Sequence, residues 1–251
     1  MDAQIALIIA GAAVAGFVQG LSGFAFGLVA TSFWAWTIDP RLAIPMAVFG
    51  GLTGQIIAAL TVRRGFRWSL LLPFLAGGAL GVPIGVALLP RLDLLWFKTV
   101  LGLLLVIWCP LMLMAKQLPR VRVGGRVADA VAGLFGGVMG GIGGYTGVIP
   151  TLWCTLRGFD KDAQRAVVQN FNLAALAVTM ASYVATGIVT REMLPMFAIV
   201  APAMLIPSLI GMRVYSGINE AAFRQVVLVL LTLSGVALAG AALPEWSRRL
   251  S

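Results

Sequence analysis

The chain has 251 residues, of which 60% are apolar and 11% are charged, and its mean hydropathy is +0.99. A water-soluble domain of this length could not carry so much apolar surface, so the sequence is that of a polytopic membrane protein. The net charge of +9 comes from lysines and arginines between apolar stretches. This pattern is typical of cytoplasmic anchors and unlike a nucleic-acid-binding domain.

Catalytic and metal-binding side chains are scarce. The chain has no histidine, which is the commonest metal ligand and acid–base catalyst, and its two cysteines, Cys109 and Cys154, lie in apolar stretches without metal-site spacing. Every Asp and Glu stands at or beyond the end of an apolar stretch, so no buried proton relay is visible. We therefore expect neither an enzyme nor a cofactor.

Eight uncharged stretches follow one another along the chain, and about 20 residues suffice to cross the hydrocarbon core. They cover residues 3–38, 42–62, 68–90, 99–115, 130–156, 166–190, 193–212 and 225–244. No basic leader precedes the first stretch, which is too long for the core of a cleavable signal. We expect the first helix itself to direct membrane insertion.

The first stretch has 36 residues and contains four spaced glycines, Gly16, Gly20, Gly23 and Gly27. A straight helix of this length would measure about 54 Å against a core of about 30 Å. The stretch must therefore tilt steeply, break or fold back, and the glycines favour a fold-back.

The fifth stretch carries a matching ladder 120 residues later, which consists of Gly136, Gly140, Gly143 and Gly147. Asp39 and Asp160 also correspond, at a spacing of 121. Duplicated membrane proteins with helix-breaking glycines at matching places are usually transporters. The alternative is that the glycines are only seams at which helices pack closely.

The distribution of Lys and Arg indicates whether the two copies lie parallel or inverted in the membrane. If each long stretch is a hairpin, 12 of these residues lie on one face and 6 on the other, whereas single crossings give 10 and 8. The first split fits the positive-inside tendency better. We therefore predict an all-α polytopic protein of two inverted repeats, residues 1–115 and 129–251, joined by a basic cytoplasmic linker, 116–128. Each repeat consists of a glycine-broken hairpin and three transmembrane helices.

The two predicted breaks form the candidate substrate site. A helix that starts at mid-membrane exposes free N–H groups with partial positive charge, which bind oxyanions without a lysine or arginine. Nearby amides and hydroxyls would add donors, although helix–helix hydrogen bonding also explains them. The predicted substrate-binding residues are Gln19, Ser22, Gly23, Phe24, Thr53, Gly143, Gly144, Tyr145, Thr146, Gln169, Asn170 and Asn172.

The motifs at both ladders resemble a known family. The pattern G-x3-G-L-S-G-F at 16–24, the pattern G-G-x-x-G-G-I-G-G-Y at 136–145, Pro150 and the loop GFDKDAQRA at 158–166 are similar to the sulfite exporter TauE/SafE permeases. The resemblance covers both halves. It implies transport of sulfite, sulfoacetate or other sulfonates across the bacterial inner membrane by a multi-pass protein. Phe24-Ala25-Phe26 departs from the usual run of glycines after the first ladder.

Two other functions stay open on the residues alone. A permease for another small solute would use carbonyl groups at helix ends and usually an intramembrane acid, which is missing here. A non-transporting subunit would use its glycine seams to anchor a partner complex. The expected partners are a small anion and the lipid bilayer, and the pattern leaves open whether the chain forms a homodimer.

Overall fold

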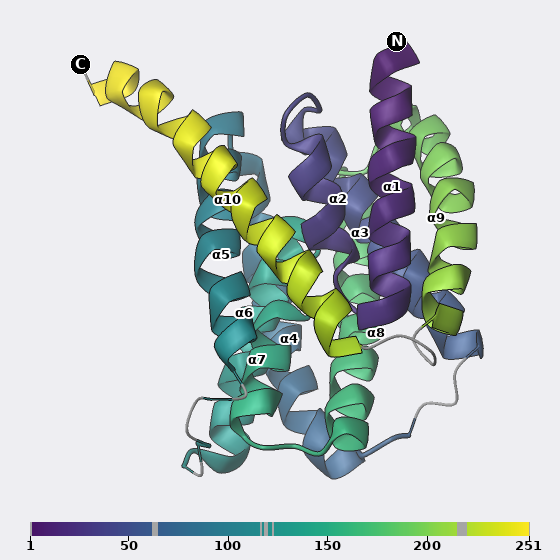
Figure 1. Ribbon diagram of the computed structural model, residues 1–251, viewed down its shortest axis with the longest axis vertical. Coiled ribbons are helices and arrows are strands. Elements are labelled where there is room, and N and C mark those ends of the chain that lie inside the picture. Colours follow the sequence, from purple (N-terminus) through teal and green to yellow (C-terminus); the bar gives the residue numbers. More distant parts are fainter. Residues whose placement is uncertain are drawn as a thin grey trace.

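A computed structural model of the chain describes residues 2–61, 65–115, 117, 120–121, 123–214 and 220–250 (Figure 1). These residues form ten α-helices and two short 3-10 helices. The α-helices are α1 (Asp2–Ser22), α2 (Phe26–Trp34), α3 (Pro40–Thr61), α4 (Trp68–Leu88), α5 (Leu94–Met114), α6 (Gly125–Gly143), α7 (Val148–Leu156), α8 (Lys161–Ala185), α9 (Leu194–Val214) and α10 (Glu220–Leu250). The 3-10 helices are η1 (Leu89–Arg91) and η2 (Arg191–Met193).

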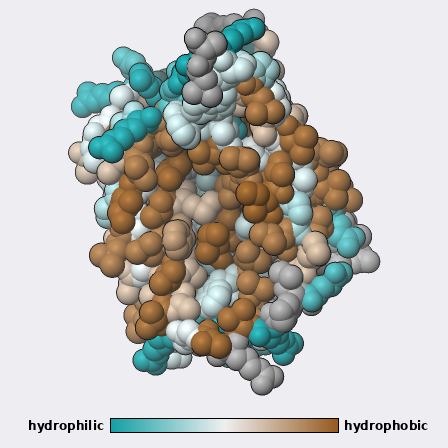
Figure 2. Space-filling model, turned by 90° about the vertical axis from the view of Figure 1, so that its left-hand side faces the viewer, coloured by the Kyte–Doolittle hydropathy of each residue, from teal (hydrophilic) through white to brown (hydrophobic). Residues whose placement is uncertain are grey.

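The structure confirms an all-α polytopic membrane protein. Seven helical segments are long and apolar enough to cross a membrane, and they are drawn from α1, α3, α4, α5, α8, α9 and α10. Large apolar side chains stay exposed along them, Ile107 and Leu230 among others. Figure 2 shows hydrophobic residues across the middle of one face and hydrophilic residues toward its two ends. The hydrophobic middle is the surface that a bilayer would cover.

The helices before and after residue 120 follow one another in the same order. In each half a long helix is followed by a helix of nine residues, α2 or α7, and then by three long helices. Figure 1 shows α1 running from the N-terminus toward the middle of the molecule and α2 returning. Both termini lie at one end, and the connection between α5 and α6 lies at the other.

Both long first helices end at a glycine with left-handed backbone, a conformation that side chains disfavour. Gly23 follows α1 with φ of 83°, and Gly144 follows α6 with φ of 76°. They stand 121 residues apart, as do Asp39 and Asp160 at the starts of α3 and α8. The spacing of 120 that the ladders suggest is therefore one residue too short.

Glycine seams join the helices of one half to those of the other. A Cβ at Gly137 would lie 2.7 Å from the carbonyl oxygen of Gly78, so α6 packs backbone to backbone on α4. In the same way, a Cβ at Gly16 would lie 2.7 Å from the carbonyl oxygen of Met204, where α1 packs on α9. Some ladder glycines are thus packing residues, as the alternative interpretation held.

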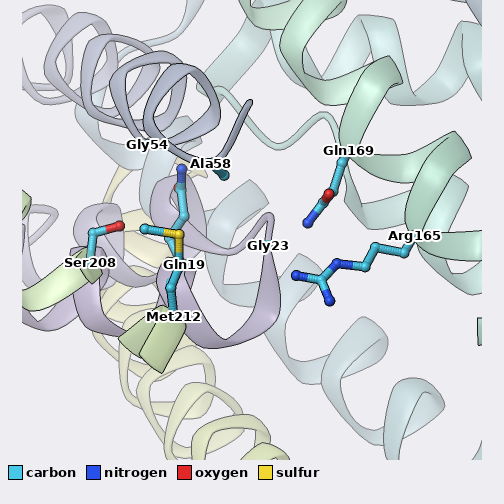
Figure 3. Close-up of a pocket in the computed structure, with 9 residues that line it drawn as sticks. Gln19, Gly23, Gly54, Ala58, Arg165, Gln169, Ser208 and Met212 are labelled. Atoms are coloured by element: carbon cyan, nitrogen blue, oxygen red, sulfur yellow. The ribbon is translucent and has the colours of Figure 1, made fainter. Parts of the chain in front are cut away.

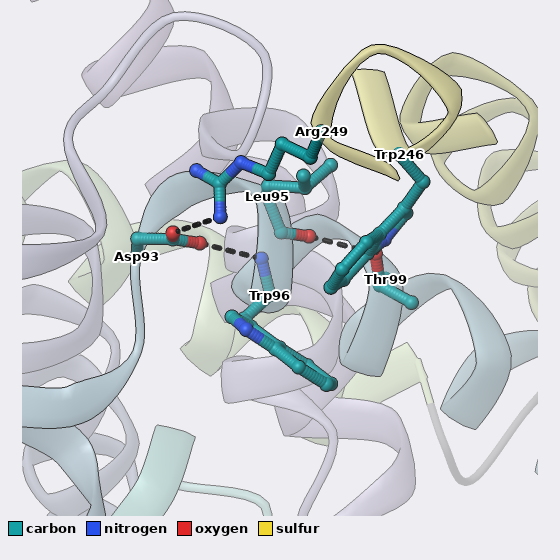
Figure 4. Close-up of polar contacts among 6 residues, drawn as sticks. All are labelled: Asp93, Leu95, Trp96, Thr99, Trp246 and Arg249. Carbon is teal, nitrogen blue, oxygen red and sulfur yellow. Dashed lines mark hydrogen bonds and ion pairs between the residues drawn. The ribbon is translucent and has the colours of Figure 1, made fainter. Parts of the chain in front are cut away.

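A polar cluster fastens the C-terminal end of α10 to the start of α5 (Figure 4). Arg249 pairs with Asp93 at 2.8 Å, and the indole N–H of Trp246 donates to Thr99 Oγ1. The backbone N–H of Trp96 and the Arg249 side chain hold the pKa of the Asp93 carboxyl below its usual value. Because the pair is about half exposed, it contributes little stability on its own.

Candidate functional site

A small cavity lies where α1 ends, between α1, α3, α8 and α9 (Figure 3). Its volume of about 10 Å³ holds about one water molecule, so this conformation has no room for a larger solute. The residues that line it are Gln19, Gly20, Gly23, Gly54, Ala58, Arg165, Gln169, Ser208 and Met212. The cavity therefore adjoins the first helix break.

Three of the predicted site residues, Gln19, Gly23 and Gln169, meet at this cavity. The Gln19 amide is buried and donates to the carbonyl oxygen of Gly51 at 3.0 Å. A Cβ at Gly23 would lie 3.0 Å from Nε2 of Gln169, so the α8 amide lies directly against the broken backbone. Gln55 donates to the Gly23 carbonyl at 2.5 Å and ties the break to α3. Amide side chains from α1, α3 and α8 thus lie at the first break.

Arg165 also lines the cavity, and the sequence did not single it out. Figure 3 shows its guanidinium pointing toward Gly23, beside the Gln169 amide. The side chain is partly buried on the second turn of α8. The sequence favours neutral donors, because no lysine or arginine lies within an apolar stretch and Arg165 stands between two of them. The spacing of Arg165, Gln169 and Asn172 at i, i+4 and i+7 could have indicated it, since those positions share a helix face.

The other predicted residues of the first half do not line the cavity. Ser22 is exposed, and its Oγ accepts weak hydrogen bonds from the N–H groups of Phe24 and Ala25 at 3.4 and 3.3 Å. The Phe24 ring meets Trp108 edge to face, with centroids 6.0 Å apart. Thr53 donates to the Phe49 carbonyl within its own helix.

The second break has satisfied backbone groups and a buried interior. The N–H of Gly144 donates to the Gly140 carbonyl at 2.8 Å, and that of Tyr145 donates to the Met139 carbonyl at 3.3 Å. The first of these bonds is that of an αL cap, in which the left-handed residue after the helix donates to the carbonyl four residues earlier. Tyr145 and Thr146 are buried, as is Gly143. The Tyr145 hydroxyl donates to Thr31 Oγ1 on α2 at 3.0 Å.

The two breaks touch one another. A Cβ at Gly27 would lie 3.0 Å from the carbonyl oxygen of Gly144, and a Cβ at Gly147 would lie 2.8 Å from Cβ of Phe24. The fourth glycine of each ladder thus packs against the opposite break. Glycine is required there because any side chain would separate the two segments.

The two asparagines of α8 differ in environment. Asn170 does not line the cavity, because its Nδ2 donates to the carbonyls of Ala166 and Gly65 at 2.8 and 3.3 Å. Asn172 is fully buried, and neither its Nδ2 nor its Oδ1 has a hydrogen-bond partner among the described residues. Such a group costs stability unless something else satisfies it.

A buried carboxylate lies near the start of α6. Asp129 accepts a hydrogen bond from the Trp153 indole at 2.7 Å and pairs with Arg157 at 3.4 Å. Its side chain is 3% exposed. The cluster joins the start of α6 to the end of α7. The cluster does not line the cavity, which is consistent with a structural role, although Arg157 Nε makes no hydrogen bond among the described residues.

The apolar spanning helices and the polar cavity at a helix break define a multi-pass membrane protein of transporter type. The chain matches the family described as "Sulfite exporter TauE/SafE" over residues 8–238, and it belongs to that family. It is therefore a membrane permease of the TauE/SafE family. No curated protein and no solved structure matches it.

Proposed function

We propose that the chain moves small sulfur-containing oxyanions, such as sulfite, sulfoacetate and other sulfonates, across the bacterial inner membrane. The observation that carries this proposal is the cavity at Gly23, where the side chains of Gln19, Gln169 and Arg165 meet at a broken helix. N–H donors of this kind can replace part of the hydration shell of an oxyanion. Membership of the family supports the same class of substrate.

Transport requires the cavity to widen, because about 10 Å³ is too small for sulfite. The first break is suited to such a movement. Apart from the cap bond from the Gly23 N–H to the Gln19 carbonyl, its backbone is held by the Gln55 amide and by two long bonds to the Ser22 hydroxyl, and an incoming anion could compete for these donors. We expect the end of α1 and the start of α2 to shift when substrate binds.

Inverted repeats with two glycine-broken hairpins complete the proposed mechanism. The common helix order of the two halves, the matched left-handed glycines and the contact between the breaks support this arrangement. In such folds, access alternates when one repeat moves against the other around a central site. Both termini would then lie outside the cytoplasm.

Flux into liposomes tests the function. Purified chain should raise the uptake of radiolabelled sulfite above that of protein-free liposomes, and Gly23→Leu should abolish the increase. Gly240→Ala is the matched control, because a Cβ there meets nothing within 4 Å. If the wild-type chain moves no solute, the result favours the alternative of a non-transporting subunit that anchors a partner complex. If it moves uncharged solutes as fast as sulfite, the chain is a permease of another kind.

Cysteine labelling tests the topology. In a chain without Cys109 and Cys154, a cysteine at Arg120 should react only from the cytoplasm and one at Arg191 only from outside. The inverted arrangement predicts this because Arg120 lies in the basic link between the halves and Arg191 precedes α9. Labelling of both positions from the same face would exclude it.

A further inference from the structure

The side chains that line the cavity carry a positive charge and no negative charge. Arg165 contributes its guanidinium, and the nine lining residues, all of which the structure describes, include no aspartate or glutamate. The nearest carboxylates along α8, Asp160 and Asp162, are exposed at the start of the helix, and Asp160 faces Arg67 at 3.8 Å. A half-buried guanidinium in a wall of neutral amides favours a negatively charged occupant.

At the second break, the residues that correspond to Gln169 and Arg165 are apolar. Gln169 lies against Gly23, and the residue 121 positions before it, Val48, lies against Gly144, with its Cγ2 3.2 Å from a Cβ built there. The counterpart of Arg165 at this spacing is Ile44, which is fully buried. The two breaks therefore share a left-handed glycine, and only the first has an amide and a guanidinium at these two positions.

The face of α8 that carries Arg165 and Gln169 continues inward to Asn172. The seven residues from Arg165 to Asn172 correspond to about 10 Å along the helix. The Asn172 amide is fully buried and has no partner among the described residues. An unsatisfied amide on the same face as the cavity is the feature expected where a ligand supplies the missing hydrogen bonds.

We infer that the substrate is bound at the first break only, and that Arg165 is its counter-charge. This inference rests on the proposed function and narrows the substrate class. A guanidinium presents two parallel N–H donors, which match two oxygens of a sulfite, sulfonate or carboxylate group. The site therefore selects small anions with paired oxygens and rejects uncharged molecules of the same shape.

Methanesulfonate and dimethyl sulfone test this selection, because they are similar in shape and differ in charge. Binding is measured on the full chain in detergent, as the ligand concentration that half-saturates the rise in unfolding temperature. Wild type should prefer methanesulfonate. Arg165→Gln should weaken methanesulfonate binding about 10-fold or more and leave the sulfone unchanged, since a hydrogen-bonded charge pair is lost.

Two further variants serve as controls. Arg165→Lys keeps the positive charge but loses the two parallel N–H donors of the guanidinium. Methanesulfonate should therefore bind this variant more weakly than wild type and more tightly than Arg165→Gln. Arg67→Gln removes an exposed arginine outside the cavity and should bind methanesulfonate as wild type does. If Arg165→Gln does not purify as a folded chain, Arg165→Lys decides, and wild-type affinity in it overturns the inference.

The outcomes separate this inference from the proposed function. Unchanged methanesulfonate binding in Arg165→Gln overturns the role of Arg165, even if wild-type liposomes transport sulfite. Methanesulfonate binding that depends on Arg165, in a chain that transports no sulfur anion, supports the inference and overturns the proposed function.

Discussion

The first break, at Ser22–Ala25, and the second, at Gly144–Gly147, have similar backbones in unlike surroundings. Each follows a long helix, each begins with or contains a left-handed glycine, and each precedes a helix of nine residues. The first faces Gln169 across a cavity, and the second packs against Val48. The glycines therefore set the shape of both breaks, while the neighbouring helices α8 and α3 decide their chemistry.

The breaks also differ in what holds their backbone. At the second, the cap bonds run within the chain segment itself, from Gly144 and Tyr145 to the end of α6. At the first, the Gly23 N–H makes the same cap bond, to the Gln19 carbonyl at 2.7 Å, and the Gly23 carbonyl also accepts from a side chain of another helix, Gln55. Backbone caps are independent of side-chain rotamers, whereas a side-chain amide can exchange partners. We therefore expect the first break to move during transport and the second to stay in place.

Replacement of the two left-handed glycines should give the largest effects and should separate the breaks. Gly144→Leu combines an unfavourable backbone with crowding against the β-branched, stiff side chain of Val48 and should cost about 3 kcal/mol of unfolding free energy. Gly23→Leu meets only the movable end of Gln169, so it should destabilise the chain less and still abolish sulfite flux. Unfolding in mixed detergent micelles and liposome flux measure the two quantities. Equal losses of unfolding free energy in the two variants would contradict the proposed difference between the breaks.

Exchange of the facing residues should give the next largest effects. Gln169→Val gives the first break the apolar neighbour of the second, and it should weaken anion binding by about 1–3 kcal/mol, the cost of a hydrogen bond to a charged group. Val48→Gln should leave anion binding unchanged and lower the unfolding free energy by about 1–3 kcal/mol, because it buries an amide without a partner. Anion binding that falls equally in both variants would mean that both breaks bind substrate.

The sequence was sufficient for the all-helical membrane fold, and both long first helices end within the glycine-rich segments that it singles out. Stretch lengths and glycine spacing carry that information locally, and the family resemblance agrees with them. The register was misplaced by one residue because Gly143 and Gly144 are adjacent, and only the backbone angle distinguishes them. Where a chain has 30 glycines, spacing alone cannot separate a helix cap from a packing seam such as Gly137.

The candidate site was harder to predict, because it depends on contacts between distant segments. Gln19 and Gln169 were expected beside the break, yet nothing in the sequence says that Gln169 faces Gly23 while Asn170 turns to Gly65. Charge marks the end of an apolar stretch, so the sequence places Arg165 in a loop. The helix in fact begins at Lys161, which brings Arg165 onto the cavity face.

The smallest expected effect tests whether the second break is static. The Tyr145 hydroxyl donates to Thr31 Oγ1, which itself donates to the Gly27 carbonyl at 2.6 Å, so α2 is joined to the second break. Tyr145→Phe should cost about 1 kcal/mol of unfolding free energy, because one buried hydrogen bond is lost. Thr31→Val should cost a similar amount, and the double variant should cost less than the two added together, since both remove the same bond.

Sulfite flux through Tyr145→Phe should stay close to that of wild type, because a static break needs only to remain folded. The same liposomes report flux, and the mixed-micelle assay reports stability. A strong loss of flux with unchanged stability would show that the Tyr145–Thr31 bond changes during the transport cycle. The second break would then be a moving part, and the difference between the breaks would lie only in which of them binds the anion.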